Sequence, residues 1–311
     1  MKNINEFSEG EQIKGVYLVS NVTRGKTTTG SDYLSIKFQD ASGEIDAKVW
    51  QVSPEQMAEI VNGAFVYIDA NVIKYRDSLQ LKVESTKTVA EEEVDVTRFI
   101  KSAPVAKVDL RNELQQFIYE IDDRIINTVV TEMVKKYEDK LVDYPAAAKI
   151  HHAYHSGLIF HIVSMLRIAR ALIGLYPSLD KNYLYAGIIL HDLGKIEELS
   201  GLIATEYTTK GKLLGHISIV HSQIQKIAED INESESEQVI VLEHLVLSHH
   251  GKLEYGSPVL PLTKEAEILT FIDNIDARMD TLDKALESVE PGTFSARLFA
   301  LDNRSFYKPK D

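Results

Sequence analysis

The feature that most constrains the fold of this 311-residue chain is a polar pair at the end of an apolar run. Residues 186–190 read Ala-Gly-Ile-Ile-Leu, and His191 and Asp192 follow directly. Gly194 then breaks the run before Lys195. A carboxylate buried without a partner is costly, so Asp192 needs a cation or a basic group beside it. Any fold of this chain has to provide that partner.

Further residues of metal-binding type lie on other apolar stretches. They are His161, His216, His249, His250 and Asp273. Asp273 sits among apolar neighbours, with Asp276 and Asp280 near the same helix face. Each residue has an ordinary alternative, such as a hydrogen-bonded core histidine for His161, or dipole-complementing histidines at a helix end for the pair. Together, however, these alternatives require four or five unrelated polar burials. We therefore interpret the set as a metal site, and its order suggests a metal-dependent phosphohydrolase.

Composition limits the chemistry of such a site. The chain has no cysteine, so a bound metal must be held by histidine and carboxylate groups. Those donors suit Mn, Fe, Co, Zn and Mg and do not choose among them. The net charge of −13 argues against a general nucleic-acid coat but allows a local channel. We find no signal peptide and no stretch that approaches about 20 apolar residues, and expect a cytoplasmic protein with no membrane partner.

The N-terminal region is predicted to be a β-barrel. β-Branched and aromatic residues predict strands at Ile13–Val22, Tyr33–Gln39, Glu44–Trp50, Phe65–Tyr75 and Ser78–Glu84. Ser53 is a plausible N-cap for a short helix from Pro54 to about Val61. Five strands with a helix between the third and the fourth follow the order of an oligonucleotide-binding (OB) barrel.

The rest of the chain is predicted to be helical. Apolar positions at helical spacing predict helices at Asp109–Tyr119, Arg124–Tyr137, Ser156–Leu175, Lys181–Leu193, His216–Asn232, Glu237–His249 and Lys264–Ser288. The fold class is thus multidomain α and β, an OB-type five-stranded barrel followed by an all-α helical bundle. We expect an OB domain at 1–90, a linker at 91–108 and a helical domain at 109–311, with its motif core at about 150–290.

The ordered histidines and aspartates over residues 156–280 resemble the HD phosphohydrolase superfamily. The resemblance is narrowed by His151-His-Ala-Tyr-His155-Ser-Gly-Leu-Ile-Phe-His161, by Leu-Gly-Lys after the His-Asp pair, and by Asp273-Asn-Ile-Asp276-Ala-Arg278. With the predicted barrel in front, the whole chain resembles the YhaM family of 3′→5′ exoribonucleases. The likeness extends to the C-terminal stretch Asp302-Asn-Arg304-Ser-Phe-Tyr307-Lys-Pro309.

This resemblance implies a one-metal or two-metal centre on a helical bundle. Its implied primary ligands are His161, His191, Asp192 and Asp273. In relatives with two ions the aspartate of the His-Asp pair bridges both. The positions of His216 and of either His249 or His250 then hold the second ion, and we favour His249. All of these positions are filled, which favours a binuclear site, and manganese is the ion that the resemblance implies.

Further candidates surround this centre. A hydroxide held by one or two divalent cations is a ready nucleophile for a phosphodiester. Lys195 is either a positive charge for the same phosphate or a solvated lysine at a helix end. His155 and Arg278 are candidate phosphate or leaving-group contacts. His151 and His152 either line the entrance or cap a turn.

The barrel argues for a polymeric substrate, because OB faces stack bases on aromatic side chains and follow the backbone with basic ones. Tyr33, Lys37 and Lys48 are the candidate contacts to nucleic acid. Several barrel aromatics, with Trp50 a candidate among them, are expected to fill the interior instead. We expect single-stranded RNA as the substrate, with single-stranded DNA as a second one. An acidic surface and an appended barrel are compatible with a homo-oligomer.

Two other functions stay open at this point. An HD core alone would also suit a small-nucleotide phosphohydrolase that acts on a dNTP, an alarmone or a cyclic dinucleotide. A single-strand-binding protein with an inactive HD core is the non-enzymatic alternative. The direction of degradation comes only from the resemblance.

Overall fold

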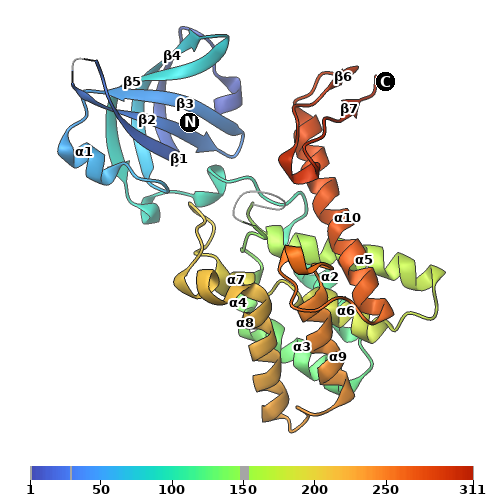
Figure 1. The fold of residues 1–311 in the computed structure, drawn as a ribbon. Helices are drawn as coiled ribbons and strands as arrows, with labels where there is room; N and C mark the ends of the chain where they lie inside the picture. Colours follow the sequence, from blue (N-terminus) through green and yellow to red (C-terminus); the bar gives the residue numbers. More distant parts are fainter. Residues whose placement is uncertain (1, 29, 148–153, 311) are drawn as a thin grey trace. The chain divides into compact units, whose positions relative to one another are not determined.

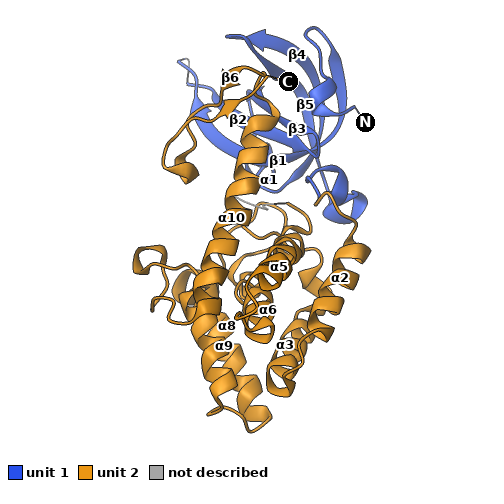
Figure 2. Ribbon diagram, turned by 90° about the vertical axis from the view of Figure 1, so that its right-hand side faces the viewer, with its two compact units in different colours: residues 1–102 blue, residues 103–311 orange. Residues whose placement is uncertain are grey.

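The computed structural model describes residues 2–28, 30–147 and 154–310. The chain divides into two compact units, residues 1–102 and 103–311, coloured separately in Figure 2. His151 and His152 lie outside the described residues, so their predicted roles stay predictions.

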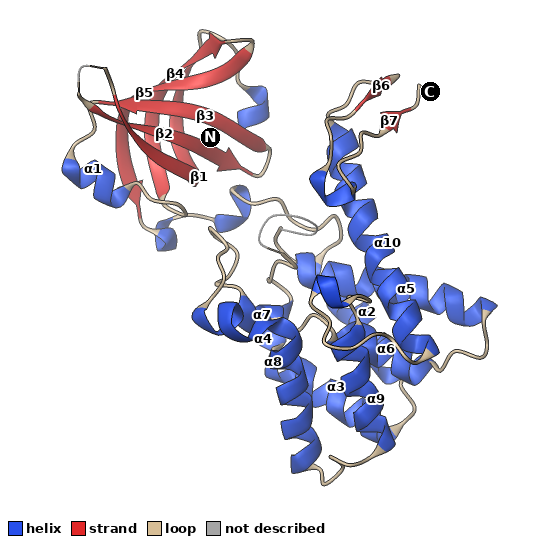
Figure 3. Ribbon diagram, viewed as in Figure 1, coloured by secondary structure: helices blue, strands red, loops and turns tan. Residues whose placement is uncertain are grey.

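The first unit is a closed five-stranded barrel (Figure 3). Its elements are β1 (Gln12–Lys26), β2 (Asp32–Asp40), β3 (Gly43–Trp50), α1 (Pro54–Glu59), β4 (Phe65–Tyr75) and β5 (Ser78–Val89). The strand order is β1-β2-β3-β5-β4, with β3 and β5 parallel and the other pairs antiparallel. Ser53 caps α1 by accepting a hydrogen bond from the amide of Gln56. This is the order of an OB barrel, as predicted.

The barrel core follows the two-residue period of its strands. On β2, Leu34, Ile36 and Phe38 are buried, and Phe38 lies against buried Tyr17 with ring centroids 6.5 Å apart. The suggestion that Trp50 fills the interior is wrong, since its side chain is 49% exposed. Buried Val49 precedes it, so strand alternation points Trp50 outward.

One carboxylate, Asp40, is buried in the barrel, and the chain itself satisfies it. Its Oδ2 accepts from the amide of Ile4 at 2.8 Å. Its Oδ1 accepts from the amide of Ser42 at 2.8 Å, from the Ser42 hydroxyl at 2.6 Å and from the amide of Gly43 at 3.2 Å. Asp40 therefore acts as a structural group of the β2–β3 turn.

Part of the predicted linker packs on the barrel. Short 3-10 turns occupy Glu91–Glu93 and Val96–Arg98. Phe99 is buried against Phe65 with ring centroids 4.9 Å apart, and the amide of Ala41 donates to the carbonyl of Arg98 at 2.9 Å. These residues belong to the first unit.

The second unit is helical (Figure 1). Its helices are α2 (Lys107–Tyr119), α3 (Arg124–Lys136), α4 (Glu138–Leu141), α5 (Gly157–Leu175), α6 (Lys181–Leu190), α7 (Lys195–Glu198), α8 (Thr209–Asp230), α9 (Glu237–Ser248) and α10 (Lys264–Glu287). A two-stranded hairpin, β6 (Thr293–Phe294) with β7 (Tyr307–Lys308), follows α10 and was not predicted. α8 begins earlier than predicted, but Gly215 interrupts it at φ 71°, so its regular part starts at His216.

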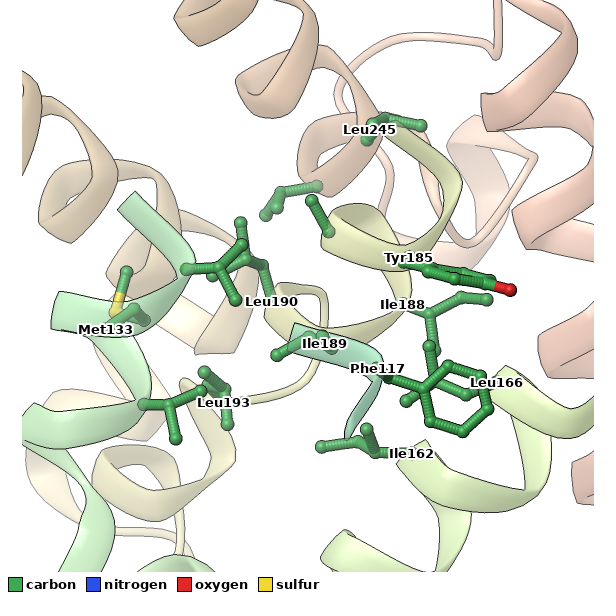
Figure 4. Packing of buried hydrophobic residues seen from close by; sticks show 14 of the residues in the cluster. Phe117, Met133, Ile162, Leu166, Tyr185, Ile188, Ile189, Leu190, Leu193 and Leu245 are labelled. Atoms are coloured by element: carbon green, nitrogen blue, oxygen red, sulfur yellow. The ribbon is translucent and has the colours of Figure 1, made fainter. Parts of the chain in front are cut away.

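The helical core surrounds α5 and α6 (Figure 4). α6 is buried from Leu184 to Leu190, and α5 packs against α2, α6 and α10. α5 corrects one expectation, because this helix of 19 residues is apolar enough to span a membrane by length and composition. Core helices pass the same test, and nearly half of the apolar stretch of α5 is buried here.

Candidate metal centre

Five histidines and two aspartates lie where helices of the second unit meet. His161 comes from α5 and Asp273 from α10. The others lie at helix boundaries and are His191 and Asp192 after α6, His216 after the break in α8, and His249 and His250 after α9. Gly194 allows this approach, because a Cβ there would lie 2.4 Å from the carbonyl oxygen of His216.

Each histidine is held in place through its Nδ1 atom. Three of them bond to backbone carbonyls at 2.7 Å, namely His191 to Ile188, His249 to Val246 and His250 to Tyr255. His161 Nδ1 lies 2.7 Å from Asp276 Oδ2, and His216 Nδ1 lies 3.0 Å from Glu198 Oε1. For His191, His216, His249 and His250, a bond at Nδ1 favours the tautomer whose Nε2 carries the lone pair, which is the usual arrangement of a metal-ligating histidine.

Several buried atoms at the centre lack a hydrogen-bond partner within the described part of the chain. They are the Nε2 atoms of His191, His216 and His249, and Oδ1 of Asp192. Leaving such atoms unsatisfied costs about 1–3 kcal/mol each, so this clustering needs an explanation. A divalent cation supplies one, because imidazole nitrogens and carboxylate oxygens are its ligands.

The donors form two groups, one on each side of Asp192. Ligand atoms of His161, His191 and Asp192 lie within 4.8 Å of one another, and so do those of His216, His249 and His250. Asp192 Oδ2 lies 3.3 Å from His191 Nε2 and 3.8 Å from His161 Nε2. Its Oδ1 faces the other group, 3.5 Å from His216 Nε2 and 3.9 Å from His249 Nε2.

Asp273 stands beside the first group. Its Oδ1 lies 3.2 Å from His161 Nε2. Burial would raise the pKa of Asp273, but the hydrogen bond and charge of His161 lower it. Asp273 is therefore a carboxylate that can take part in holding a cation.

Charge in the centre suits cation binding. Burial would raise the pKa of Asp192, but the charges of Lys195 and His191 hold it well below its usual range. Burial, together with His191 and His250, lowers the pKa of His249, so its imidazole is neutral at pH 7. Burial alone would lower the pKa of His161, whereas Asp273 and Asp276 raise it to about 9. A cation at His161 therefore has to displace a proton.

Lys195 contacts the carboxylate of Asp192, which lies between the two groups of donors. Its Nζ donates to Asp192 Oδ2 at 2.6 Å, and its side chain is 12% exposed. The alternative of a solvated lysine at a helix end does not describe this environment.

Two predicted phosphate contacts pair with acidic residues. His155 Nε2 lies 3.2 Å from Asp143 Oδ1, and burial together with Lys107 lowers the pKa of His155. Arg278 Nη2 lies 3.7 Å from Asp302 Oδ2 in the C-terminal segment. No hydrogen bond or ion pair that we find among the described residues joins either side chain to the histidine groups, and their predicted roles stay predictions.

Three supporting residues were not assigned from the sequence. Asp276 binds His161, and its other oxygen accepts from Ser164 Oγ. Glu198 accepts from the Nδ1 and the amide of His216. The period of α10 places Asp276 near the face of Asp273, which is a usable signal, whereas Glu198 reaches His216 only through the tertiary fold.

The predicted nucleic-acid contacts lie on β2 and β3 of the barrel. Tyr33 pairs with exposed Trp50 across the strands at 5.1 Å between ring centroids. Lys48 Nζ lies 5.1 Å from the centroid of the Tyr33 ring and donates to Ser35 Oγ at 2.8 Å. Lys37 forms an ion pair with Glu44 at 3.3 Å. Tyr33, Lys48 and Trp50 thus form one group, which we call the barrel platform, and Lys37 lies outside it.

Among solved structures, the chain is similar to the solution structure of the second OB-fold domain of replication protein A from Methanococcus maripaludis. The identity is 15% and the TM-score 0.24, over 30% of this chain and 98% of that one.

A helical unit with this histidine and aspartate centre, preceded by an OB-type barrel, defines a multidomain protein of the HD class. The model of the HD domain family matches residues 158–278. The chain is also 49% identical over 309 residues to the 3′-5′ exoribonuclease YhaM of Shouchella clausii strain KSM-K16, covering 99% of this chain and 97% of that protein. The chain belongs to the YhaM family of 3′-5′ exoribonucleases, which confirms the resemblance and the fold class predicted from the sequence.

Proposed function

We propose that this protein is a metal-dependent 3′→5′ exoribonuclease that hydrolyses the phosphodiester bonds of single-stranded RNA and releases nucleoside monophosphates. Family membership supports the reaction and its direction. The observation that carries the proposal is the cluster of buried Nε2 and Oδ1 atoms around Asp192, each histidine being fixed through its Nδ1. A small-nucleotide phosphohydrolase is less favoured, because a substrate of one or two nucleotides needs no strand-binding surface such as the barrel platform.

The centre is proposed to hold two divalent cations. His161, His191, Asp273 and Oδ2 of Asp192 would hold one, and His216, His249 and Oδ1 of Asp192 the other. His250 lies in the second group as well, and we favour His249 because its Nε2 is buried and faces Asp192 at 3.9 Å. We propose manganese as the activating ion.

Bound cations would supply an activated water nucleophile and charge neutralisation on the phosphate. Residues of the chain prepare this site. Asp192 is kept ionised, and Lys195 fixes the orientation of its carboxylate through the 2.6 Å bond. Lys195 also adds a positive charge beside the phosphate position. His155 and Arg278 would contact the phosphate or the leaving group only after their present ion pairs with Asp143 and Asp302 open.

The barrel is proposed to bind the single strand upstream of the 3′ end. Stacking of bases on the rings of Tyr33 and Trp50 is independent of sequence, and Lys48 and Lys37 would contact the phosphates. A single strand of DNA offers the same bases and phosphates and is proposed as a second substrate. We propose residues 1–90 as the nucleic-acid-binding domain, 91–108 as a linker and 109–311 as the hydrolase domain, acting in the cytoplasm.

The proposal is tested with the full-length protein loaded with Mn²⁺ and a 12-nucleotide single-stranded RNA. With a 5′ label, we expect a ladder of shortened labelled products; with a 3′ label, we expect labelled mononucleotide from the start. Chelation should stop both reactions, and re-addition of Mn²⁺ should restore them. Immediate release of a 5′-labelled mononucleotide would contradict the direction. Hydrolysis of a dNTP, an alarmone or a cyclic dinucleotide without any cleavage of RNA would favour the alternative.

A further inference from the structure

The C-terminal residues form a surface that the proposed centre does not use. We call residues 291–310 the C-terminal ribbon. It has a single acidic residue, Asp302, but its basic residues are Arg297, Arg304, Lys308 and Lys310. Its aromatic residues are Phe294, Phe299, Phe306 and Tyr307. This is a basic and aromatic segment in a chain with a net charge of −13.

The C-terminal ribbon has a defined fold. β6 and β7 pair antiparallel, and the amide of Ser295 donates to the carbonyl of Phe306 at 2.8 Å. Leu301, in the turn between the two strands, is 1% exposed. Lys308 Nζ donates to the carbonyl of Leu286 on α10 at 2.9 Å. The ribbon therefore presents its other side chains from a fixed support.

Three aromatic residues of the ribbon are exposed to solvent. Phe299 is 93% exposed, although it lies in the same short turn as buried Leu301. Phe294 and Tyr307 face each other across the two strands with ring centroids 5.1 Å apart, and they are 66% and 47% exposed. The guanidinium of Arg304 lies 5.2 Å from the centroid of the Phe306 ring. Exposed rings within a basic segment form the kind of surface on which single strands stack their bases and have their phosphates neutralised.

The same helix carries the ribbon and one edge of the metal centre. Asp273 lies within α10, which ends at Glu287, and the ribbon follows a few residues later. The ribbon lies along the last part of this helix, since Asp302 pairs with Arg278 at 3.7 Å and Lys308 bonds to Leu286 at 2.9 Å. A helix rises about 1.5 Å per residue, so these two attachment points lie roughly 8 Å and 20 Å from Asp273 along the axis. These distances correspond to about two to six nucleotides of a stacked strand at 3.4 Å each, and to fewer when the strand is extended.

We propose that the C-terminal ribbon is a second contact for single-stranded RNA, which holds the strand several nucleotides upstream of the 3′ end at the metal centre. The inference rests on the proposed exoribonuclease function. Phe299, Phe294 and Tyr307 stack on bases, and Arg297 contacts a phosphate. The ribbon therefore matters for long strands and not for strands too short to reach it.

The test compares hydrolysis of a 12-nucleotide and a 3-nucleotide RNA by the full-length, Mn²⁺-loaded protein. The variants are Phe299→Ala and the double variant Phe299→Ala/Arg297→Ala. Tyr119→Ala is the matched control, since Tyr119 ends α2 and is 88% exposed. We expect kcat/KM for the 12-nucleotide RNA to fall about tenfold in the double variant and to stay unchanged for the 3-nucleotide RNA. In the double variant, kcat/KM for the 12-nucleotide RNA should depend less steeply on salt concentration, because one phosphate contact is lost.

Equal rates for the variants and for Tyr119→Ala on the 12-nucleotide RNA would overturn the inference. A fall in molar mass by light scattering, with unchanged hydrolysis, would overturn it too and assign the ribbon to self-association. If the unmodified protein cleaves neither RNA, the proposed function itself has failed. The inference alone fails when the unmodified protein cleaves both and the variants match it.

Discussion

The two units each bury a carboxylate, and their surroundings differ. Asp40 in the barrel is 3% exposed and accepts four hydrogen bonds from the chain around it. Asp192 in the helical unit is 2% exposed, and its Oδ1 has no hydrogen-bond partner among the described residues. The first arrangement is complete without a ligand and the second is not. Burial of a polar group alone does not indicate function. A buried polar group that the fold leaves without a hydrogen-bond partner does indicate it.

The surfaces of both units show a related feature among their apolar groups. The barrel keeps Tyr17 and Phe38 inside but leaves Trp50 half-exposed beside Tyr33. The helical unit covers its core yet exposes Phe299 almost completely. An exposed ring that contributes little to the packing of its own unit is a candidate for binding, in the same way as an unsatisfied buried atom.

The largest expected effect separates the two carboxylates. Asp192→Asn should lower the rate of RNA hydrolysis by about 10³-fold or more, because it removes charge from the centre. Asp40→Asn should leave kcat unchanged and lower the free energy of unfolding by about 1–3 kcal/mol, because Asp40 accepts several hydrogen bonds. Hydrolysis rates and urea unfolding curves of both variants check this. A folded Asp40→Asn protein as inactive as Asp192→Asn would break the comparison.

The next largest effect is expected for the carboxylates that bond to the Nδ1 atoms of the histidines. Glu198→Gln and Asp276→Asn should each weaken Mn²⁺ binding about 10–100-fold, because they orient His216 and His161. Calorimetric titration with Mn²⁺ measures this. Glu243→Gln is the control, since Glu243 is also buried but bonds to Gln225 on α8. Equal affinities in all three variants would show that the hydrogen bonds at Nδ1 do not matter for the ions.

A smaller effect is expected on the barrel platform. Trp50→Ala should lower kcat/KM for a 12-nucleotide RNA roughly tenfold, the value of one stacked base, and leave a 3-nucleotide RNA unaffected. Tyr176→Ala in the helical unit, 58% exposed, serves as the control for loss of a surface ring. If Trp50→Ala slowed the short RNA to the same degree, the platform would be acting on the centre and not on the strand.

The smallest effect concerns stability and pH. Burial would raise the pKa of Glu197, but hydrogen bonds from Lys210, Tyr137 and Lys136 lower it to about 2. A carboxylate with a lowered pKa stabilises the fold above its unfolded value near 4.5 and loses this contribution as pH falls toward 2. Glu197→Gln should therefore lower the free energy of unfolding by roughly 1 kcal/mol at pH 7, and this difference should shrink below about pH 4.5 and be largely lost at about pH 2. Urea unfolding at the two pH values measures it, and a difference that does not depend on pH would contradict the assignment.

The features that depend on local pattern could be predicted from the sequence. Helical periodicity located α3, α9 and α10 to within a residue or two, and strand alternation located β2 and β3. The cost of burying a carboxylate singled out Asp192 from its apolar neighbours alone. Features that depend on tertiary placement could not be predicted from the sequence. Glu198 meets His216 only because the chain turns through α7, and the outward face of Trp50 follows from the position of Val49 in the barrel.

Side-chain packing and direction explain the remaining differences between the sequence predictions and the structure. Arg278 and His155 have the chemistry of phosphate ligands, but their spacing could not reveal that Asp302 and Asp143 lie next to them. The apolar composition of α5 resembles that of a membrane helix because many of its side chains pack in the helical core. His249 and His250 are adjacent in sequence, and the structure distinguishes them by burial, since only His249 is fully enclosed.

The most direct test is the number and coupling of Mn²⁺ ions bound by the full-length protein, alongside Asp192→Ala. Equilibrium dialysis with metal analysis gives the number, and electron paramagnetic resonance shows whether the ions interact. We predict two ions per chain with a spin-coupled signal, and in Asp192→Ala the loss of that coupling and of at least one ion. Two uncoupled ions that persist in Asp192→Ala, or no Mn²⁺ bound by the unmodified protein, would contradict a centre built around this carboxylate.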